Sequence, residues 1–289
     1  MARNKKDEHY PVVRTGRLFR QSPDPIGPKL QVSVEQLLAK TNRRLYRQSR
    51  YYNLKLDLDA DSTRSIDVFV LADSWMVERA LKMGYDMYLE NSAAARDRLK
   101  SNAIARWEDF RVISGASITI ANPLQYAADG TPDELDSGEF SNTEVEDANG
   151  TTRIFTWGPG FSTAYGLMEQ YDLAGNANRS PTSSTGAMPY DDLMADDSAA
   201  MANDLQQRGD LPPYDANGVN ATKTWVKVAT LDATSPAQRL STGYFVAPCG
   251  FVLLADHLSP GSQPVAESDI AWTVKAGDYK GVHAPSMLE

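Results

Sequence analysis

Hydrophobic and polar residues alternate along the first part of the chain body, and this alternation predicts strands. Leu54, Leu56 and Leu58 alternate with Lys and Asp, as expected for a strand that buries one face. A polar stretch then predicts a turn, and the run Ile66–Leu71 predicts a second strand. Because only this turn separates the two strands, we expect them to pair as an antiparallel hairpin.

Two stretches have the three-to-four-residue spacing of amphipathic helices. Apolar residues at this spacing follow residues 73–74, which are of types that cap helix N-termini. Residues 91–92 restart the pattern, so we expect paired helices inserted over about residues 74–105. The short segment Val32–Lys40 predicts one or two further helical turns, with Ser33 as the N-cap.

The rest of the pattern predicts strands and loops. Residues 121–220 hold seventeen Asp or Glu against three Arg, and their Asn, Gly, Ser, Thr and Pro content predicts long, acidic surface loops. The strand Thr152–Trp157 and a helix over residues 191–207 interrupt them. Pro248 is expected at an edge or a break. The C-terminal third predicts strands at Thr224–Leu231, Gly243–Ala255 and Asp269–Ala276.

Charge is divided unevenly along the chain. The net charge of the 289 residues is −9, yet residues 1–50 carry twelve Lys or Arg against four Asp or Glu. Four prolines in this segment disfavour regular structure. We therefore expect an extended basic N-terminal arm over residues 1–50 and an acidic body over residues 51–289. Such an arm fits a polyanion or a negatively charged partner surface; alternatively, it is a solvated, partly flexible terminus.

Composition excludes several classes of protein. Hydrophobic residues make up 42% and charged residues 23%, as in globular proteins, and we find neither a membrane-spanning apolar run nor a signal peptide. One cysteine, Cys249, and three scattered histidines cannot form a Cys/His zinc site. Glycine-rich phosphate loops and hydrolase signatures are absent. We therefore expect no enzyme, catalytic residue, metal or cofactor, although acidic loop clusters have the oxygen ligands that structural calcium prefers.

The densest basic patch surrounds Tyr46 and precedes Tyr51 and Tyr52. Arginines neutralise phosphates and aromatic rings stack on bases, a combination suited to single-stranded nucleic acid. Alternatively, these arginines pair with the acidic body or with a neighbouring subunit. We favour a surface that faces a polyanion. The candidate nucleic-acid-binding residues are Arg3, Lys5, Lys6, Arg14, Arg17, Arg20, Arg43, Arg44, Arg47 and Arg50.

In its order of elements, the chain resembles jelly-roll major capsid (coat) proteins of small icosahedral viruses. The resemblance lies in a basic arm, Arg43–Tyr52 leading into the first strand, long loops between short strands, and a β-rich C-terminal third. It implies a mainly β fold, an antiparallel β-sandwich (jelly roll) with inserted helices. It also implies a virion protein that self-assembles into an icosahedral shell around the viral genome, with the arm and its arginines inside and residues 121–220 outside. A shell over an internal membrane is also compatible with it.

Two alternatives belong to other classes. A β-sandwich that binds or hydrolyses carbohydrate would stack sugars on Trp157, Trp225 or Trp272 and use loop carboxylates as acid and base. A virion accessory protein, such as a vertex or tail-attachment component, would form a small ring. The size of the assembly distinguishes these alternatives from a shell.

Overall fold

A strand that buries every second side chain lies at the centre of the fold. In the computed structural model, β3 (Tyr51–Leu58) alternates between half-buried and buried residues, and Leu54, Leu56 and Leu58 belong to the buried set. This confirms the strand predicted from the alternation. The second predicted strand is confirmed as β4 (Ser65–Leu71), which is buried along almost its whole length.

The structure describes most of the chain in separate stretches. These are residues 15–18, 29–58, 65–98, 107–115, 119–120, 122–130, 132–134, 142–147, 149–174, 224–256 and 270–288.

Two sheets, antiparallel except at one edge, make up the main body, which is mainly β as expected. The four-stranded sheet has the order β1-β14-β3-β12, with β1 (Thr15–Leu18), β14 (Ile270–Val274) and β12 (Phe245–Pro248). The five-stranded sheet has the order β11-β4-β13-β2-β5; β2 and β5 pair in parallel. Its other strands are β11 (Trp225–Asp232), β13 (Phe251–Asp256), β2 (Lys29–Ser33) and β5 (Thr119–Ile120).

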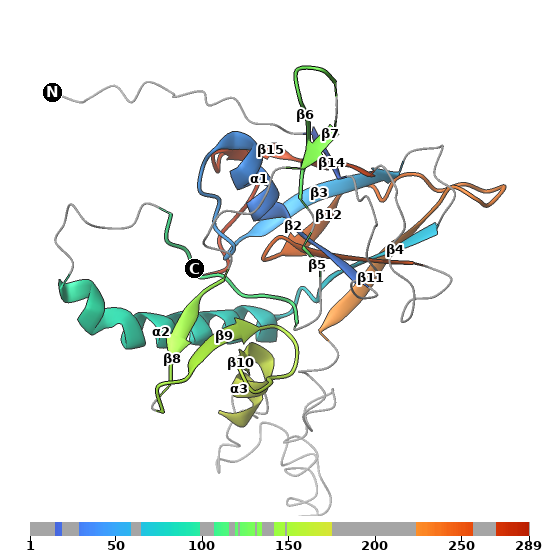
Figure 1. Ribbon diagram of the computed structural model, residues 1–289. Coiled ribbons are helices and arrows are strands. Elements are labelled where there is room, and N and C mark those ends of the chain that lie inside the picture. Colours follow the sequence, from blue (N-terminus) through green and yellow to red (C-terminus); the bar gives the residue numbers. More distant parts are fainter. Residues whose placement is uncertain are drawn as a thin grey trace, which may run out of the picture.

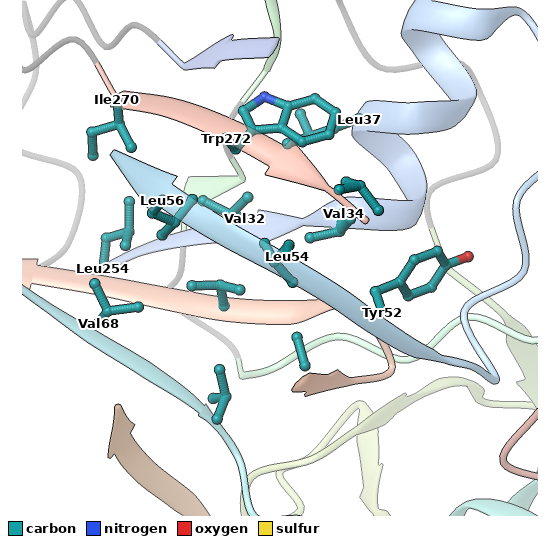
Figure 2. Close-up of a cluster of buried hydrophobic side chains, with 14 of the residues drawn as sticks. Val32, Val34, Leu37, Tyr52, Leu54, Leu56, Val68, Leu254, Ile270 and Trp272 are labelled. Atoms are coloured by element: carbon teal, nitrogen blue, oxygen red, sulfur yellow. The ribbon is translucent and has the colours of Figure 1, made fainter. Parts of the chain in front are cut away.

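One hydrophobic core joins the two sheets, in the arrangement of a β-sandwich. Leu56 of β3 and Trp272 of β14 belong to the same buried cluster as Val68 of β4 and Leu254 of β13. Figure 2 shows these side chains with the strands that carry them. Because each sheet covers the apolar face of the other, the core excludes water without help from the inserted helices.

The strands pair in a nested order. β1 pairs with β14, β2 with β13, β3 with β12, and β4 with β11. β3 and β4 therefore lie in different sheets, and the predicted β3–β4 hairpin is wrong. The alternation correctly showed which face of β3 is buried, but the partners of β3 come from the far end of the chain.

Part of the predicted arm belongs to the sandwich. β1, β2 and helix α1 (Val34–Asn42) all lie within residues 1–50. The helix is confirmed two residues later than expected. Ser33 is its N-cap by position, but its side chain makes no capping bond and instead accepts a hydrogen bond from Gln31 Nε2 at 2.6 Å. Residues 1–14 and 19–28 lie outside the described residues.

The predicted insertion near residues 74–105 contains one long helix, α2 (Trp75–Arg98). The expected restart at residues 91–92 is wrong, because the Ser92 hydroxyl donates to the Tyr88 carbonyl at 2.7 Å within a continuous helix. Residues 99–106 are not described. In the described ranges, no helix is long and apolar enough to cross a membrane.

Short elements after α2 form a second unit beside the sandwich. Helix α3 (Leu167–Leu173) and the three-stranded sheet β10-β9-β8 share a second core with α2. Figure 1 shows them on one side of the main sheets. β9 confirms the strand predicted at Thr152–Trp157, whereas the helix predicted over residues 191–207 is not in the described part. The strands are β8 (Glu144–Glu146), β9 (Thr152–Thr156), β10 (Ala164–Gly166) and a separate hairpin of β6 (Leu124–Tyr126) and β7 (Pro132–Glu134).

The three C-terminal strand predictions are confirmed, and one of the three predicted stretches forms two strands. The stretch predicted at Gly243–Ala255 forms β12 and β13, and Pro248 ends β12 at the edge of its sheet. Cys249 and Gly250 have φ values of 56° and 68°, which turn the chain from one sheet into the other. A small hairpin follows β14, made of β15 (Ala276–Gly277) and β16 (Gly281–Val282).

Candidate polyanion interface

The arginine-rich segment, residues 43–50, connects α1 to β3. Arg43 ends the helix because it adopts the left-handed conformation, with φ 52°. The chain then turns toward β3. Tyr46, Gln48 and Ser49 are buried within this turn, whereas Arg47 is exposed and Arg44 and Arg50 are half-buried. The segment is therefore anchored by uncharged residues, and Arg47 is the most open of these three arginines.

Gln48 is the main anchor of the segment. Its side-chain amide donates to the Val112 carbonyl at 2.9 Å and accepts from the Val112 N–H at 2.6 Å, as a strand neighbour would. Its backbone N–H donates to Asp109 Oδ2 at 2.9 Å. These bonds join the connection between α1 and β3 to the chain that follows α2, so the arginines sit on a rigid base.

A fully buried carboxyl group lies beneath this base. Glu35 Oε1 accepts a 3.4 Å hydrogen bond from Gln48, while Oε2 has no hydrogen-bond partner. Burial raises the pKa of Glu35 from 4.5 to about 7; Arg111 opposes the rise and Asp109 adds to it. Burial also raises the pKa of Asp109, against the Gln48 N–H and the nearby Arg111 and Arg47.

The β15–β16 hairpin brings a further cation to the arginines. Lys280 lies in the turn of this hairpin, and its amine donates to the Leu45 carbonyl. Tyr46 donates through its hydroxyl to the Lys280 carbonyl at 3.1 Å, and the Arg47 N–H donates to the Tyr279 hydroxyl at 3.1 Å. These contacts bring residues 44–50 against residues 279–280, which are more than 200 positions later in the chain.

Arg50 and Arg47 contact other parts of the protein body. The Arg50 guanidinium lies 3.6 Å from the centre of the Tyr279 ring and donates to the Ala284 carbonyl at 2.6 Å. Arg47 Nη1 lies 3.8 Å from Asp109 Oδ1; the Arg47 side chain is 49% exposed and that of Asp109 is 2% exposed. The structure therefore supports part of the alternative in which the arginines contact the protein body, yet Arg47 remains open to solvent.

The result is a basic cluster, which we define as Arg44, Arg47, Arg50 and Lys280. Desolvation lowers the pKa of Lys280, and the three arginines lower it further, while Asp109 opposes them. Sequence reasoning missed Lys280, because its only link to the arginine-rich segment is spatial.

The tyrosines of the segment are not available for base stacking. Tyr46 and Tyr52 are fully buried in the sandwich core. Tyr51 donates to Glu78 of α2 and packs on the second core. Of the two contributions predicted for nucleic-acid binding, arginine charge and tyrosine stacking, these three tyrosines therefore do not supply the second.

The remaining candidates are divided between described and undescribed segments. Arg17 lies in edge strand β1, whereas Arg3, Lys5, Lys6, Arg14 and Arg20 fall outside the described residues. Of the tryptophans proposed to stack on sugar, Trp157 and Trp272 are fully buried and Trp225 is half-buried. In the part of the chain that the structure describes, no three His, Cys, Asp or Glu side chains gather as a metal site. Cys249 is buried as a free thiol.

Comparisons of the chain with protein-family models, with curated proteins and with solved structures find no match.

Proposed function

We propose that this protein is a major capsid protein of jelly-roll type, which self-assembles into an icosahedral shell around a viral genome. In this proposal, residues 43–50 and the N-terminal arm face the interior. The virion is its location, and further copies of the chain and the genome are its partners.

The nested strand pairing is the observation that carries the proposal. Numbered along the chain, the eight strands β1, β2, β3, β4, β11, β12, β13 and β14 pair first with last, second with seventh, third with sixth, and fourth with fifth. The jelly roll of viral capsids and lectin-type domains is an eight-stranded antiparallel arrangement in two facing sheets, and the nested pairing supports the proposal that this sandwich is of that type. In the described sheets, the short parallel strand β5 is added beside β2.

The position of the insertion supports a shell protein over a carbohydrate-active one. The chain between β4 and β11, residues 72–224, contributes α2, α3 and the small sheets without interrupting the nested pairs. A shell wall can carry such additions on its surface. Trp157 and Trp272, which the carbohydrate alternative would use, have no exposed surface for a sugar.

Exposed apolar side chains support self-association. Tyr244 and Val246 are 55% and 38% exposed at β12, an edge strand whose backbone is paired on one side in the described sheet. Met87 and Leu173 are also exposed, beside a cavity of 630 Å³ between α2, α3 and the small sheet. Exposed apolar groups and open strand edges are typical of surfaces that associate.

Electron microscopy of the purified protein, with analytical ultracentrifugation, tests the proposal. We expect uniform closed shells, and we expect Val246→Glu to prevent their formation by placing a charge on the β12 edge. Ala237→Glu, which adds the same charge at an exposed loop position, is the matched control and should still assemble. Only monomers or small oligomers of the wild-type protein, over a range of salt and calcium concentrations, would refute the proposal.

A further inference from the structure

The positive charges of the basic cluster repel one another, which is electrostatically unfavourable. Arg44, Arg47 and Arg50 repel the Lys280 ammonium, whereas Asp109 attracts it. The cluster is nonetheless fixed in place by the Tyr46, Tyr279 and Gln48 contacts. A fixed group of cations with a positive excess is suited to an anion that supplies the missing negative charge.

The internal contacts leave donors for such an anion. An arginine has five N–H donors and a lysine three. Arg50 donates to one carbonyl, at Ala284, and Lys280 donates to one, at Leu45. Arg47 is half exposed beside Asp109, which acts as a positioning residue because it is buried and lies against the guanidinium. Multiple donors around one point match the several oxygens of a phosphate group.

Aromatic groups at the cluster serve the protein rather than a ligand. Tyr46 is fully buried, and its ring meets that of Tyr279 edge to face, with the ring centres 6.0 Å apart. Arg50 covers the Tyr279 ring at 3.6 Å. Both rings are thus engaged in contacts within the protein, and the main features that the cluster offers a ligand are charge and hydrogen-bond donors.

We propose that the basic cluster binds the phosphate groups of an extended polyanion through Arg44, Arg47, Arg50 and Lys280, without stacking on bases. This inference rests on the proposed function only in taking the genome as the natural polymer. It makes the folded body, as well as the arm, a binding surface, and it assigns a role to Lys280. Binding is then independent of nucleotide sequence and strongly dependent on salt.

The experiment compares three polyanions on the full-length protein by fluorescence anisotropy. The probes are a thymidine oligonucleotide, an abasic deoxyribose-phosphate oligomer of the same length, and inorganic polyphosphate as a competitor. We expect the two oligomers to differ by less than about fivefold in Kd, since one stacked base alone adds about that factor. Clearly tighter binding of the thymidine oligomer, by more than that factor, would overturn the absence of stacking. Competition by polyphosphate would show that phosphate alone suffices; binding of the abasic oligomer without such competition would assign the site to a sugar-phosphate backbone.

The double variant Arg44→Gln/Lys280→Gln tests the residues. We expect roughly tenfold or greater weakening at low salt, and a salt dependence of log K that is shallower by about 1.4, from two lost phosphate contacts. Arg79→Gln/Lys82→Gln removes two exposed cations from α2 and is the matched control, for which we expect unchanged binding. Arg44→Gln alone, with half the change in slope, provides the test if the double variant does not fold.

Equal affinity of the Arg44→Gln/Lys280→Gln variant, the control and the wild type would refute the cluster as a binding site. Such a result would leave shell formation untouched, because shells are scored by microscopy. Conversely, absence of shells together with the expected binding differences would refute the proposed function and retain the phosphate site.

Discussion

Glu35 makes the stability of this protein depend on pH in a defined direction. Its carboxyl group is fully buried, and its pKa rises from 4.5 to about 7 on folding. Between these two values the native state holds a proton that the unfolded chain has released, so stability falls as pH rises. Above about pH 7 the charge is present in both states and the loss is complete.

The magnitude follows from the two pKa values. Between pH 5 and pH 8, linkage gives a loss on the order of 2–3 kcal/mol from Glu35. Glu35→Gln keeps the shape of the side chain and the oxygen that accepts from Gln48, but it removes the titration. The free energy of unfolding of the variant should therefore rise relative to that of the wild type by on the order of 2–3 kcal/mol from pH 5 to pH 8. Asp109 is present in both proteins, so only the part of its titration that is coupled to Glu35 enters the comparison.

Urea unfolding followed by tryptophan fluorescence measures this difference, because Trp157 and Trp272 are buried in the native state. Glu90→Gln removes a carboxylate from an exposed position of α2 and is the matched control. The reasoning fails if the free-energy difference between Glu35→Gln and the wild type is the same at pH 5 and pH 8.

Two further predictions concern packing and the anchor of the basic segment. Leu56→Ala should lower the free energy of unfolding by about 2–5 kcal/mol, because Leu56 is fully buried between the sheets; Leu173→Ala, at an exposed position, should change it by less than about 0.5 kcal/mol. Equal effects of the two substitutions in urea unfolding would contradict the assigned core. Gln48→Ala should speed hydrogen exchange at the Val112 amide, whose acceptor is the Gln48 side chain, while the Ile113 amide, bonded to the Phe155 carbonyl, keeps its protection. Unchanged exchange at Val112 would contradict the anchoring role.

Sequence reasoning succeeded where burial alone determines the pattern. β3 has one buried face, so its alternation is visible in the residues themselves. β14 has the same pattern and was located nearly to its ends. Pro248 indicated the edge of a sheet, because proline lacks the backbone N–H donor that a central strand requires. These properties are local, and a single sequence contains them.

Which strands pair with each other was not predictable from the sequence in the same way. The alternation of β3 is satisfied equally by β4 as a hairpin partner and by the observed β12 and β14, since all present apolar residues. β1 and β2 are short and lie in a proline-containing segment, so no periodicity marked them. Lys280 joins the arginines only because the β15–β16 hairpin folds against residues 44–50.

The nested pairing of the strands has a consequence for the synthesis of the protein. Thr15 in β1 faces Thr273 in β14, so the four-stranded sheet cannot close until the more than 250 residues between them have been translated. At usual elongation rates, that takes on the order of 15 to 60 s. During this interval the early strands have apolar faces and open edges without their native partners, which makes the nascent chain prone to aggregation. Folding of the four-stranded sheet is therefore completed by β14. A chain truncated before β14 would lack the strand that lies between β1 and β3.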